Sequence, residues 1–277
     1  MSVVQEILRV MDTQMVTPEP YGWFHVMWCV LSVVAAVLLC IWHKKDASEE
    51  RIRRVVLWVS VTVAVLEVYK LTNYSFSYDG GVSFDFQWYA FPFQFCSTPM
   101  YVGILAGLLK KGRIHDSLYA YLATYSLFAG VAVMVYPVSV FIGTVGINIQ
   151  TMFCHGSMIT LAIYLMYTGY VKLAYRTILK AMPVFVVAVS IASVMNEVAY
   201  RTGLLESETF NMFFISPYCD PHLPVYSLVQ EKLAYPWCLI VYVIGFTLAA
   251  FIMLLLGMGI KHQGAKVNAH HTAKATV

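Results

Sequence analysis

One cysteine and one histidine stand in otherwise apolar sequence and have side chains suited to joint chemistry. Cys96 lies in the stretch FPFQFCSTPM, residues 91–100, and His155 follows another cysteine in the motif CHG. A thiolate attacks a carbonyl carbon while an imidazole transfers the proton, which is the arrangement used in cysteine-dependent acyl transfer. The pair predicts a nucleophile at Cys96 and a general base at His155.

Two amide side chains accompany the pair. Gln94 stands two residues before the cysteine, and Asn196 lies in a later apolar segment. Amide N–H groups stabilise the oxyanion that develops when a carbonyl is attacked. We therefore expect Gln94 and Asn196 to position the substrate carbonyl.

Ionisable residues in the same apolar segments predict a polar pocket. An unpaired charge inside a membrane is costly, so Lys70 is expected to pair with Glu67 or Glu197. These three residues would shape the pocket or hold a lipid headgroup. His25 is a further pocket candidate, although it also suits an interfacial aromatic belt with neighbouring tryptophans.

Composition indicates what must position these residues. Hydrophobic residues make up 60% of the 277, charged residues only 12%, and the mean hydropathy is +0.69. Soluble domains carry about 25% charged residues, and a spanning helix needs about 20 mostly apolar residues. Continuous apolar runs predict helices rather than a barrel. The prediction is an all-α, polytopic bundle of seven transmembrane helices within one domain, 21–260, with spans near 22–42, 54–73, 91–109, 116–136, 148–170, 178–200 and 236–260.

The basic residues predict the orientation of this bundle. Lysines and arginines gather after the first, third, fifth and last spans, as at 44–54 and 110–113. The positive-inside rule then places the amino terminus outside and the carboxyl terminus in the cytoplasm. Residues 1–20 show no cleavable signal and are expected to form an outer interfacial helix. The tail 261–277 is expected to be cytoplasmic and disordered.

This orientation brings the intramembrane polar residues to one depth. Several predicted spans carry them within about 10 Å of the outer boundary. Glu67, Lys70 and Tyr74 follow one helical face at i, i+3 and i+7. Pro92 is expected in the first turn of the third span, and Pro99 is expected to leave a carbonyl free beside Cys96. We predict an outer pocket flanked by loops 74–90 and 201–235, with the second loop as a cap.

Several other classes of function are disfavoured. The six cysteines form no C-x-x-C spacing, so no metal or other cofactor is predicted. Acidic residues interrupt the basic run at 44–54, so no nucleic-acid partner is expected. Membrane lipids are the expected partners, and the sequence leaves the oligomeric state open.

Short motifs add a resemblance to a known family. PFQFCS at 92–97, CHG at 154–156, MNE at 195–197 and FNMFFISP at 210–217 resemble the YwaF-type integral membrane proteins. Those bacterial proteins are similar to an animal transmembrane acyltransferase that remodels ether phospholipids. The resemblance implies a bacterial plasma-membrane protein, catalytic roles for Cys96 and His155, and functional roles for Asn196, Asn211 and nearby loop residues. Many bacterial members carry histidine at the position of Gln94, so a mechanism with two histidines is not expected here.

Two functional hypotheses follow from these residues. The first is a membrane-embedded lipid acyltransferase or acyl hydrolase that uses Cys96 and His155 near the outer leaflet. The alternative is a membrane sensor or carrier that uses the same outer polar pocket as a ligand site. A carrier would also need polar residues towards the inner side, and the predicted spans lack them there.

Overall fold

The computed structural model of the chain is almost entirely helical. It describes all residues except 1, 44–46, 138–139, 204–208, 221–222 and 276–277. Short elements between the α-helices are β1 (Phe76–Ser77), β2 (Ser83–Phe84), η1 (Trp88–Ala90) and η2 (Met212–Phe214). The α-helices are α1 (Val3–Met11), α2 (Trp23–His43), α3 (Glu49–Ser75), α4 (Thr98–Leu108), α5 (Arg113–Ala123), α6 (Tyr125–Val135), α7 (Val145–Tyr167), α8 (Tyr175–Thr202), α9 (Pro224–Gln230) and α10 (Tyr235–Ala275).

Six helical segments within the described residues are long and apolar enough to cross a membrane. They are α2, α3, the continuous pair α5–α6, α7, α8 and residues Tyr235–Lys261 of α10. The pair α5–α6 is interrupted only at Thr124, whose hydroxyl donates to the carbonyl of Ala120. The prediction of an all-α, polytopic membrane protein is confirmed, with six candidate spans rather than seven.

The predicted third span, 91–109, is the one that differs. Only Thr98–Leu108 is helical, and these 11 residues extend about 16 Å, roughly half of the ~30 Å hydrocarbon core. Residues 94–97 form a turn instead, in which the carbonyl of Gln94 accepts from the N–H groups of Ser97 and Thr98. Pro99 lies in the first turn of α4, where a missing N–H leaves no helical bond unmade. Pro92 therefore does not begin the helix, and Pro99 does not free a helical carbonyl.

Small residues bring α4 close to α3. A Cβ atom on Gly103 would lie 2.0 Å from the hydroxyl oxygen of Ser60, and one on Gly107 would lie 2.6 Å from Cβ of Leu57. This is the small-xxx-small spacing that lets membrane helices approach closely. The Arg53 guanidinium of α3 also donates to the carbonyl of Gly107, at 3.1 and 3.2 Å. The short helix is thus fixed to α3 along its length and at its carboxyl end.

This contact predicts a stability effect at Gly107. Gly107→Ala is expected to lower the free energy of unfolding by about 1–3 kcal/mol, because the new methyl group would overlap Cβ and Cα of Leu57 in α3. Gly245→Ala is the matched control, since a Cβ there meets nothing within 4 Å. Thermal unfolding of both variants in detergent checks the expectation, and equal melting temperatures would contradict it.

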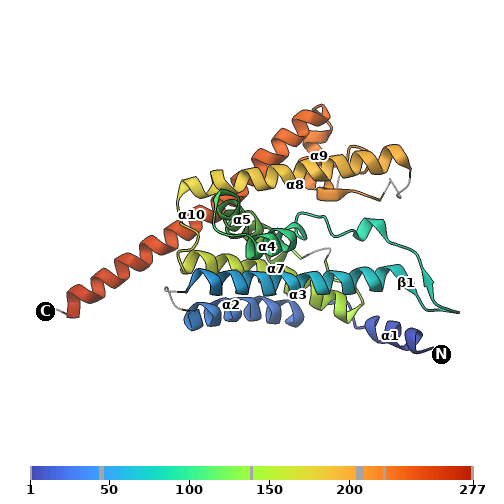
Figure 1. The fold of residues 1–277 in the computed structure, drawn as a ribbon, viewed down its shortest axis with the longest axis horizontal. Helices are drawn as coiled ribbons and strands as arrows, with labels where there is room; N and C mark the ends of the chain where they lie inside the picture. The colour runs from blue at the N-terminus through green and yellow to red at the C-terminus, as the bar shows by residue number, and fades with distance from the viewer. Residues whose placement is uncertain (1, 44–46, 138–139, 204–208, 221–222, 276–277) are drawn as a thin grey trace.

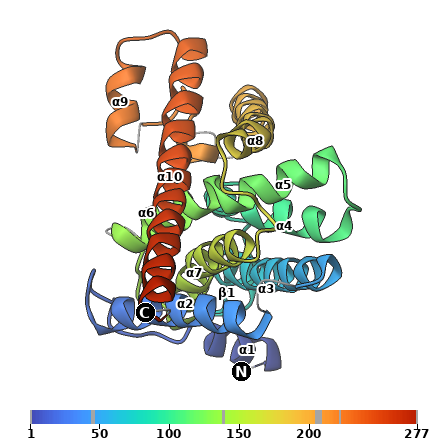
Figure 2. The same cartoon turned by 90° about the vertical axis from the view of Figure 1, so that its left-hand side faces the viewer.

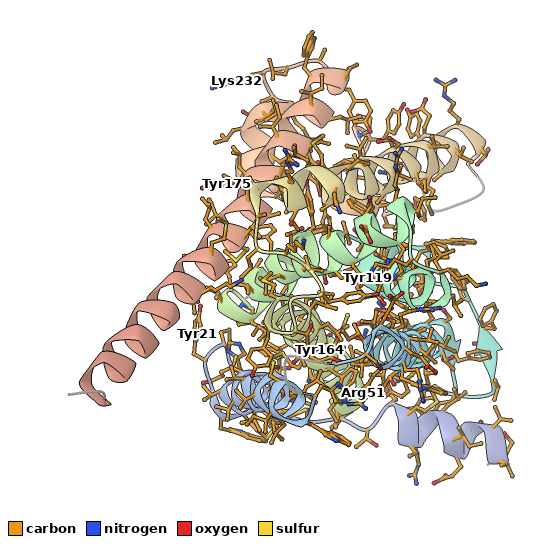
Figure 3. The ribbon with its side chains drawn as sticks, turned by 60° about the vertical axis from the view of Figure 1, so that its left-hand side comes forward. Tyr21, Arg51, Tyr119, Tyr164, Tyr175 and Lys232 are labelled. Carbon is orange, nitrogen blue, oxygen red and sulfur yellow. The ribbon has the colours of Figure 1, made fainter. Side chains whose placement is uncertain are left out.

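The helices surround α4 and α5. In Figure 1, α2, α3 and α7 pack together below, α8 runs above, and α4 and α5 lie between them. Figure 2 shows α10 crossing the molecule beside α6 and α8, with α9 next to its amino-terminal part. Tyr119 and Tyr164, labelled in Figure 3, are almost completely buried in this interior. Aromatic side chains thus fill the space where helices from both halves of the chain meet.

The terminal segments and the segment 74–90 can be compared with the structure predicted for them. Residues Val3–Met11 form a helix whose amino end is closed by a Ser2–Gln5 capping box. The segment 74–90 forms a β-hairpin that turns at Gly80 and Gly81, both with positive φ. The tail was expected to be disordered, whereas α10 continues through it to Ala275. It contains no proline that would end the helix.

Candidate active site

A polar cavity of about 330 Å³ gathers the central residues of the predicted site. Its walls come from α3, the segment before α4, the amino-terminal half of α7 and the connecting segments that hold Val140, Ile142 and Phe214. The volume lies within the ~300–1,000 Å³ typical of ligand pockets. The predicted residues on its wall are Glu67, Lys70, Gln94, Cys96 and His155.

His155 is held in the tautomer that a general base requires. Its Nδ1 lies 2.7 Å from the carbonyl oxygen of Thr151, which can only accept, so Nδ1 carries the proton. The other ring nitrogen, Nε2, is buried and has no hydrogen-bond partner among the described residues. The bond from Nδ1 thus orients the ring, and Nε2 keeps a free electron pair that can accept a proton.

Cys96 lies at the amino-terminal end of α4, just before its N-cap residue. It directly precedes Ser97, the residue before the first turn of α4, and its side chain is half-buried in the cavity wall. The positive end of a helix favours a thiolate, whereas burial in the cavity wall favours the neutral thiol, so a base is needed to take the proton. No hydrogen bond joins Cys96 to His155 within the described part of the chain. The two residues share a cavity wall, and catalytic contacts are often long before substrate binds.

A buried ion pair occupies the α3 side of the cavity. Lys70 Nζ lies 2.5 Å from Glu67 Oε2, and only 17% and 4% of the two side chains are exposed. Gln150 of α7 donates to the other carboxylate oxygen at 2.8 Å. The expected pairing of Lys70 with Glu67 is present, and Gln150 adds a link between α3 and α7.

Breaking this pair is expected to destabilise the protein strongly. Lys70→Met leaves the buried Glu67 carboxylate without its cation, which typically costs about 3–5 kcal/mol. The double variant Lys70→Met/Glu67→Gln removes both charges and should recover most of that loss. A double-mutant cycle by chemical denaturation measures the coupling. Additive effects of the two single substitutions would contradict a direct interaction.

The segment 210–216 closes one side of the cavity, and two predicted site residues hold it. Gln94 donates to the carbonyl of Asn211 at 2.9 Å and accepts from the N–H of Phe213 at 2.8 Å. Asn196 forms two hydrogen bonds with the backbone of Met212, at 2.8 and 3.0 Å. Each amide keeps a second N–H group that these bonds do not use, and Gln94 also lines the cavity. The expectation that Gln94 and Asn196 position a substrate carbonyl therefore stays a prediction.

This segment has unusual backbone geometry. Phe213 and Phe214 both have positive φ, at 59° and 56°, a conformation that is costly for residues other than glycine. The hydroxyl of Tyr242 donates to the carbonyl of Phe213, and the side chain of Asn211 accepts from the N–H of Ser216. These hydrogen bonds hold the strained turn, which brings Phe214 into the cavity wall. Of the motif FNMFFISP, Phe214 thus lines the cavity and Asn211 supports the turn from within. The expected role of the loop 201–235 as a cap stays a prediction.

His25 and Glu197 lie away from the cavity. His25 is buried, accepts from the N–H of Tyr21 at 3.0 Å and donates to the carbonyl of Met134 at 3.0 Å, which fixes α2 against the end of α6. Glu197 pairs instead with Arg201 and accepts from the hydroxyl of Tyr218 at 2.7 Å. Both residues were expected in the pocket from their depth along the predicted spans. Depth does not tell which way a helix face points, and their faces point elsewhere.

Other residues in the cavity wall were missed as site candidates. Gln150, Thr151 and Cys154 lie on the same face of α7 as His155, and Cys154 is within 3.8 Å of the carbonyl of Cys96. Their spacing along one helical face was the available signal. Tyr89, from the loop before α4, also lines the cavity, and burial raises the pKa of its hydroxyl. It remains a neutral hydrogen-bond donor at physiological pH.

The described residues offer no set of ligands for a metal ion. No group of three histidine, cysteine or acidic side chains comes together within them, and none of the six cysteines forms a disulfide. The cavity wall itself presents the thiols of Cys96 and Cys154, the imidazole of His155 and the Glu67–Lys70 ion pair.

Comparison with known proteins identifies the family. The model of the TMEM164 family matches residues 20–256, which include the whole cavity wall, the first five candidate spans and most of the sixth, Tyr235–Lys261. No curated protein and no solved structure matches the chain. The motifs that resemble YwaF-type proteins lie inside the matched range. The chain is a multi-pass integral membrane protein that belongs to the TMEM164 family.

Proposed function

We propose that the protein is a lipid acyltransferase or acyl hydrolase that uses Cys96 as nucleophile and His155 as general base. The observation that carries this proposal is the state of His155, whose buried Nε2 lacks a partner while Thr151 fixes the tautomer. The imidazole ring lines the same cavity as the Cys96 thiol, which precedes the amino-terminal end of α4. A histidine that served only to join helices would use both ring nitrogens, as His25 does.

The reaction begins with attack of the Cys96 sulfur on the ester carbonyl of a phospholipid. The thiol proton passes to Nε2 of His155 and then to the departing glycerol oxygen, so that a thioester and a lysophospholipid form. A second hydroxyl compound or water then attacks the thioester, regenerates the thiol and releases the new ester or a fatty acid. The choice between lipid hydroxyl and water decides between transferase and hydrolase.

The ion pair suggests how the substrate headgroup is held. Lys70 is the cation on the cavity wall, and its partner Glu67 also accepts a hydrogen bond from Gln150. A phosphate that approaches Lys70 would gain a charge-assisted hydrogen bond. We propose that Lys70 contacts the lipid phosphate while the ester carbonyl lies between Cys96 and His155.

The same proposal assigns a side of the membrane. The positive-inside pattern places the amino terminus outside and the carboxyl terminus in the cytoplasm, with a seventh, partial crossing by α4. The cavity then opens near the outer leaflet of a bacterial plasma membrane, and the segment 210–216 covers it. Lipid would reach the thiol from that leaflet.

Intact-mass spectrometry of the purified full chain tests the function. After incubation with phospholipids of mixed chain composition, a fraction of the protein should gain the mass of one fatty acyl group. Peptide mapping should place that group on Cys96 among the six cysteines, and neutral hydroxylamine should remove it as expected of a thioester. Free fatty acid or a new phospholipid species should accumulate in parallel.

A sensor or carrier gives a different result in the same experiment. Lipid or ligand would bind the cavity without a covalent adduct, and blocking Cys96 with a small alkylating reagent would weaken binding without stopping any turnover. Absence of both adduct and turnover with every lipid tested would overturn the enzymatic proposal and favour that alternative.

A further inference from the structure

A second cavity, on the opposite side of α4, forms an apolar groove. It has a volume of about 420 Å³ and shares none of its wall with the catalytic pair. Its walls are formed by α4, α5 and the middle of α8, and Phe93 closes one end. The α8 side consists of Pro183, Val184, Val187, Ala188 and Ile191.

The groove is open to the hydrocarbon that surrounds the protein. Several residues on its wall are exposed, among them Leu105 at 51% and Val187 at 57%. Pro183 and Ile191 are separated by about 12 Å along α8, close to the ~15 Å depth of one leaflet. Its length and composition therefore match the acyl chain of one leaflet's lipid.

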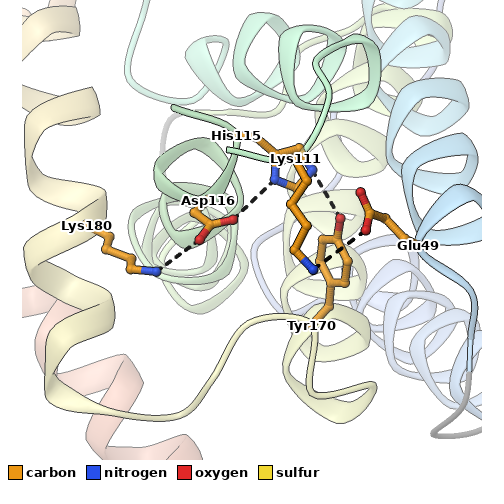
Figure 4. Close-up of polar contacts among 6 residues, drawn as sticks. All are labelled: Glu49, Lys111, His115, Asp116, Tyr170 and Lys180. Atoms are coloured by element: carbon orange, nitrogen blue, oxygen red, sulfur yellow. Dashed lines mark hydrogen bonds and ion pairs between the residues drawn. The ribbon is translucent and has the colours of Figure 1, made fainter. Parts of the chain in front are cut away.

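One end of the groove carries an arginine whose charge is not balanced. Arg113 lies on the wall, is exposed, and has no ion-pair partner among the described residues. The neighbouring ionic groups already have partners, since Lys180 pairs with Asp116 at 3.1 Å and Lys111 with Glu49 at 3.7 Å (Figure 4). Lys110, three residues earlier, also has no ion-pair partner among the described residues, but it does not line the groove. The Arg113 guanidinium is therefore the cation on the groove wall that can meet a ligand.

We propose that this groove binds one anionic phospholipid, with the phosphate on Arg113 and an acyl chain along α4 and α8. A guanidinium and a phosphate form charge-assisted, often bidentate hydrogen bonds. Ser117 provides a hydroxyl on the same wall. The bound lipid fills space that the short helix α4 leaves open, and it is distinct from the substrate because neither Cys96 nor His155 contacts the groove.

The charge at one end distinguishes this occupant from a protein helix or a second copy. A protein helix needs an apolar surface on a face about 10 Å across, whereas this groove ends in a cation suited to a small anion. An acyl chain is narrower and is joined to the anionic group that Arg113 matches. The occupant also lies beside the carboxyl end of α4, the helix whose other end is preceded by Cys96.

Photolabelling of the full chain in nanodiscs tests the proposal. The probes are a phosphatidylglycerol and a phosphatidylcholine that carry the same photoreactive acyl chain, and labelled peptides are mapped by mass spectrometry. The anionic probe is expected to label peptides of α4 and α8 several-fold more than the zwitterionic one. Both probes carry a phosphate, but the quaternary ammonium of phosphatidylcholine repels the Arg113 guanidinium and offsets the attraction of that phosphate. Raising the salt concentration should reduce the difference.

Matched variants separate specific binding from general attraction. Val187→Trp fills the groove and should remove the labelling, whereas Val186→Trp, on the neighbouring exposed position outside it, should not. Arg113→Gln should remove the preference for the anionic probe, whereas Lys110→Gln in the same loop should keep it. Equal labelling by both probes, or equal losses in the control variants, would overturn the proposal. Loss of labelling in Cys96→Ala would instead make the groove part of the substrate path and overturn its separate role.

Discussion

Cys96→Ala is expected to abolish the acyl adduct and to lower phospholipid acyl transfer by at least about a thousandfold, because no other group supplies the covalent step. Alanine removes the sulfur while keeping the backbone before α4. The measurement is release of labelled fatty acid, or its transfer to a lysophospholipid, by equal amounts of folded wild-type and variant protein.

Cys154→Ala provides the control for this substitution. Its thiol lines the same cavity and lies near the backbone of Cys96. Cys154 lies inside α7, however, whereas Cys96 lies in the turn before α4. The control variant should retain the adduct and most of the transfer rate. If Cys154→Ala loses the adduct and Cys96→Ala keeps it, the nucleophile has been assigned to the wrong cysteine.

His155→Gln is expected to reduce the rate of thioester formation by about 10²–10⁴-fold, the range that a positioned base contributes. Glutamine can still donate to the carbonyl of Thr151 but cannot accept a proton at neutral pH. Single-turnover mass spectrometry measures this step separately from release of the acyl group. The loss should become smaller as pH rises, because hydroxide then removes the thiol proton without the imidazole.

His25→Gln is the matched control for a buried histidine. Its ring joins α2 to the end of α6, so the substitution should lower the melting temperature and leave the rate per folded molecule nearly unchanged. A similar loss of rate in both histidine variants, with the same pH dependence, would show that His155 acts only through the packing of its helix.

The membrane class of the protein could be predicted from apolar runs because a bilayer requires them whatever the tertiary contacts. Segments such as 148–170 and 178–200 therefore agree with α7 and α8 to within a few residues. Residues 91–109 were equally apolar in pattern, but hydropathy does not register the turn that Gln94 and Ser97 form. The apolar run covers residues 91–109, whereas the helix within it covers only Thr98–Leu108.

The sequence alone determined the all-helical membrane architecture and the face of α3 that carries Glu67, Lys70 and Tyr74. It also singled out Cys96 and His155, whose residue types suit one chemistry and which the structure brings to one cavity. Only the tertiary structure decided the tasks of the polar residues around them. Hydrogen bonds to the backbone of 210–216 turn Gln94 and Asn196 into supports of a loop, and helix orientation moves His25 and Glu197 away. Spacing along a chain gives depth and helical face, whereas the partner of a side chain depends on which element packs against that face.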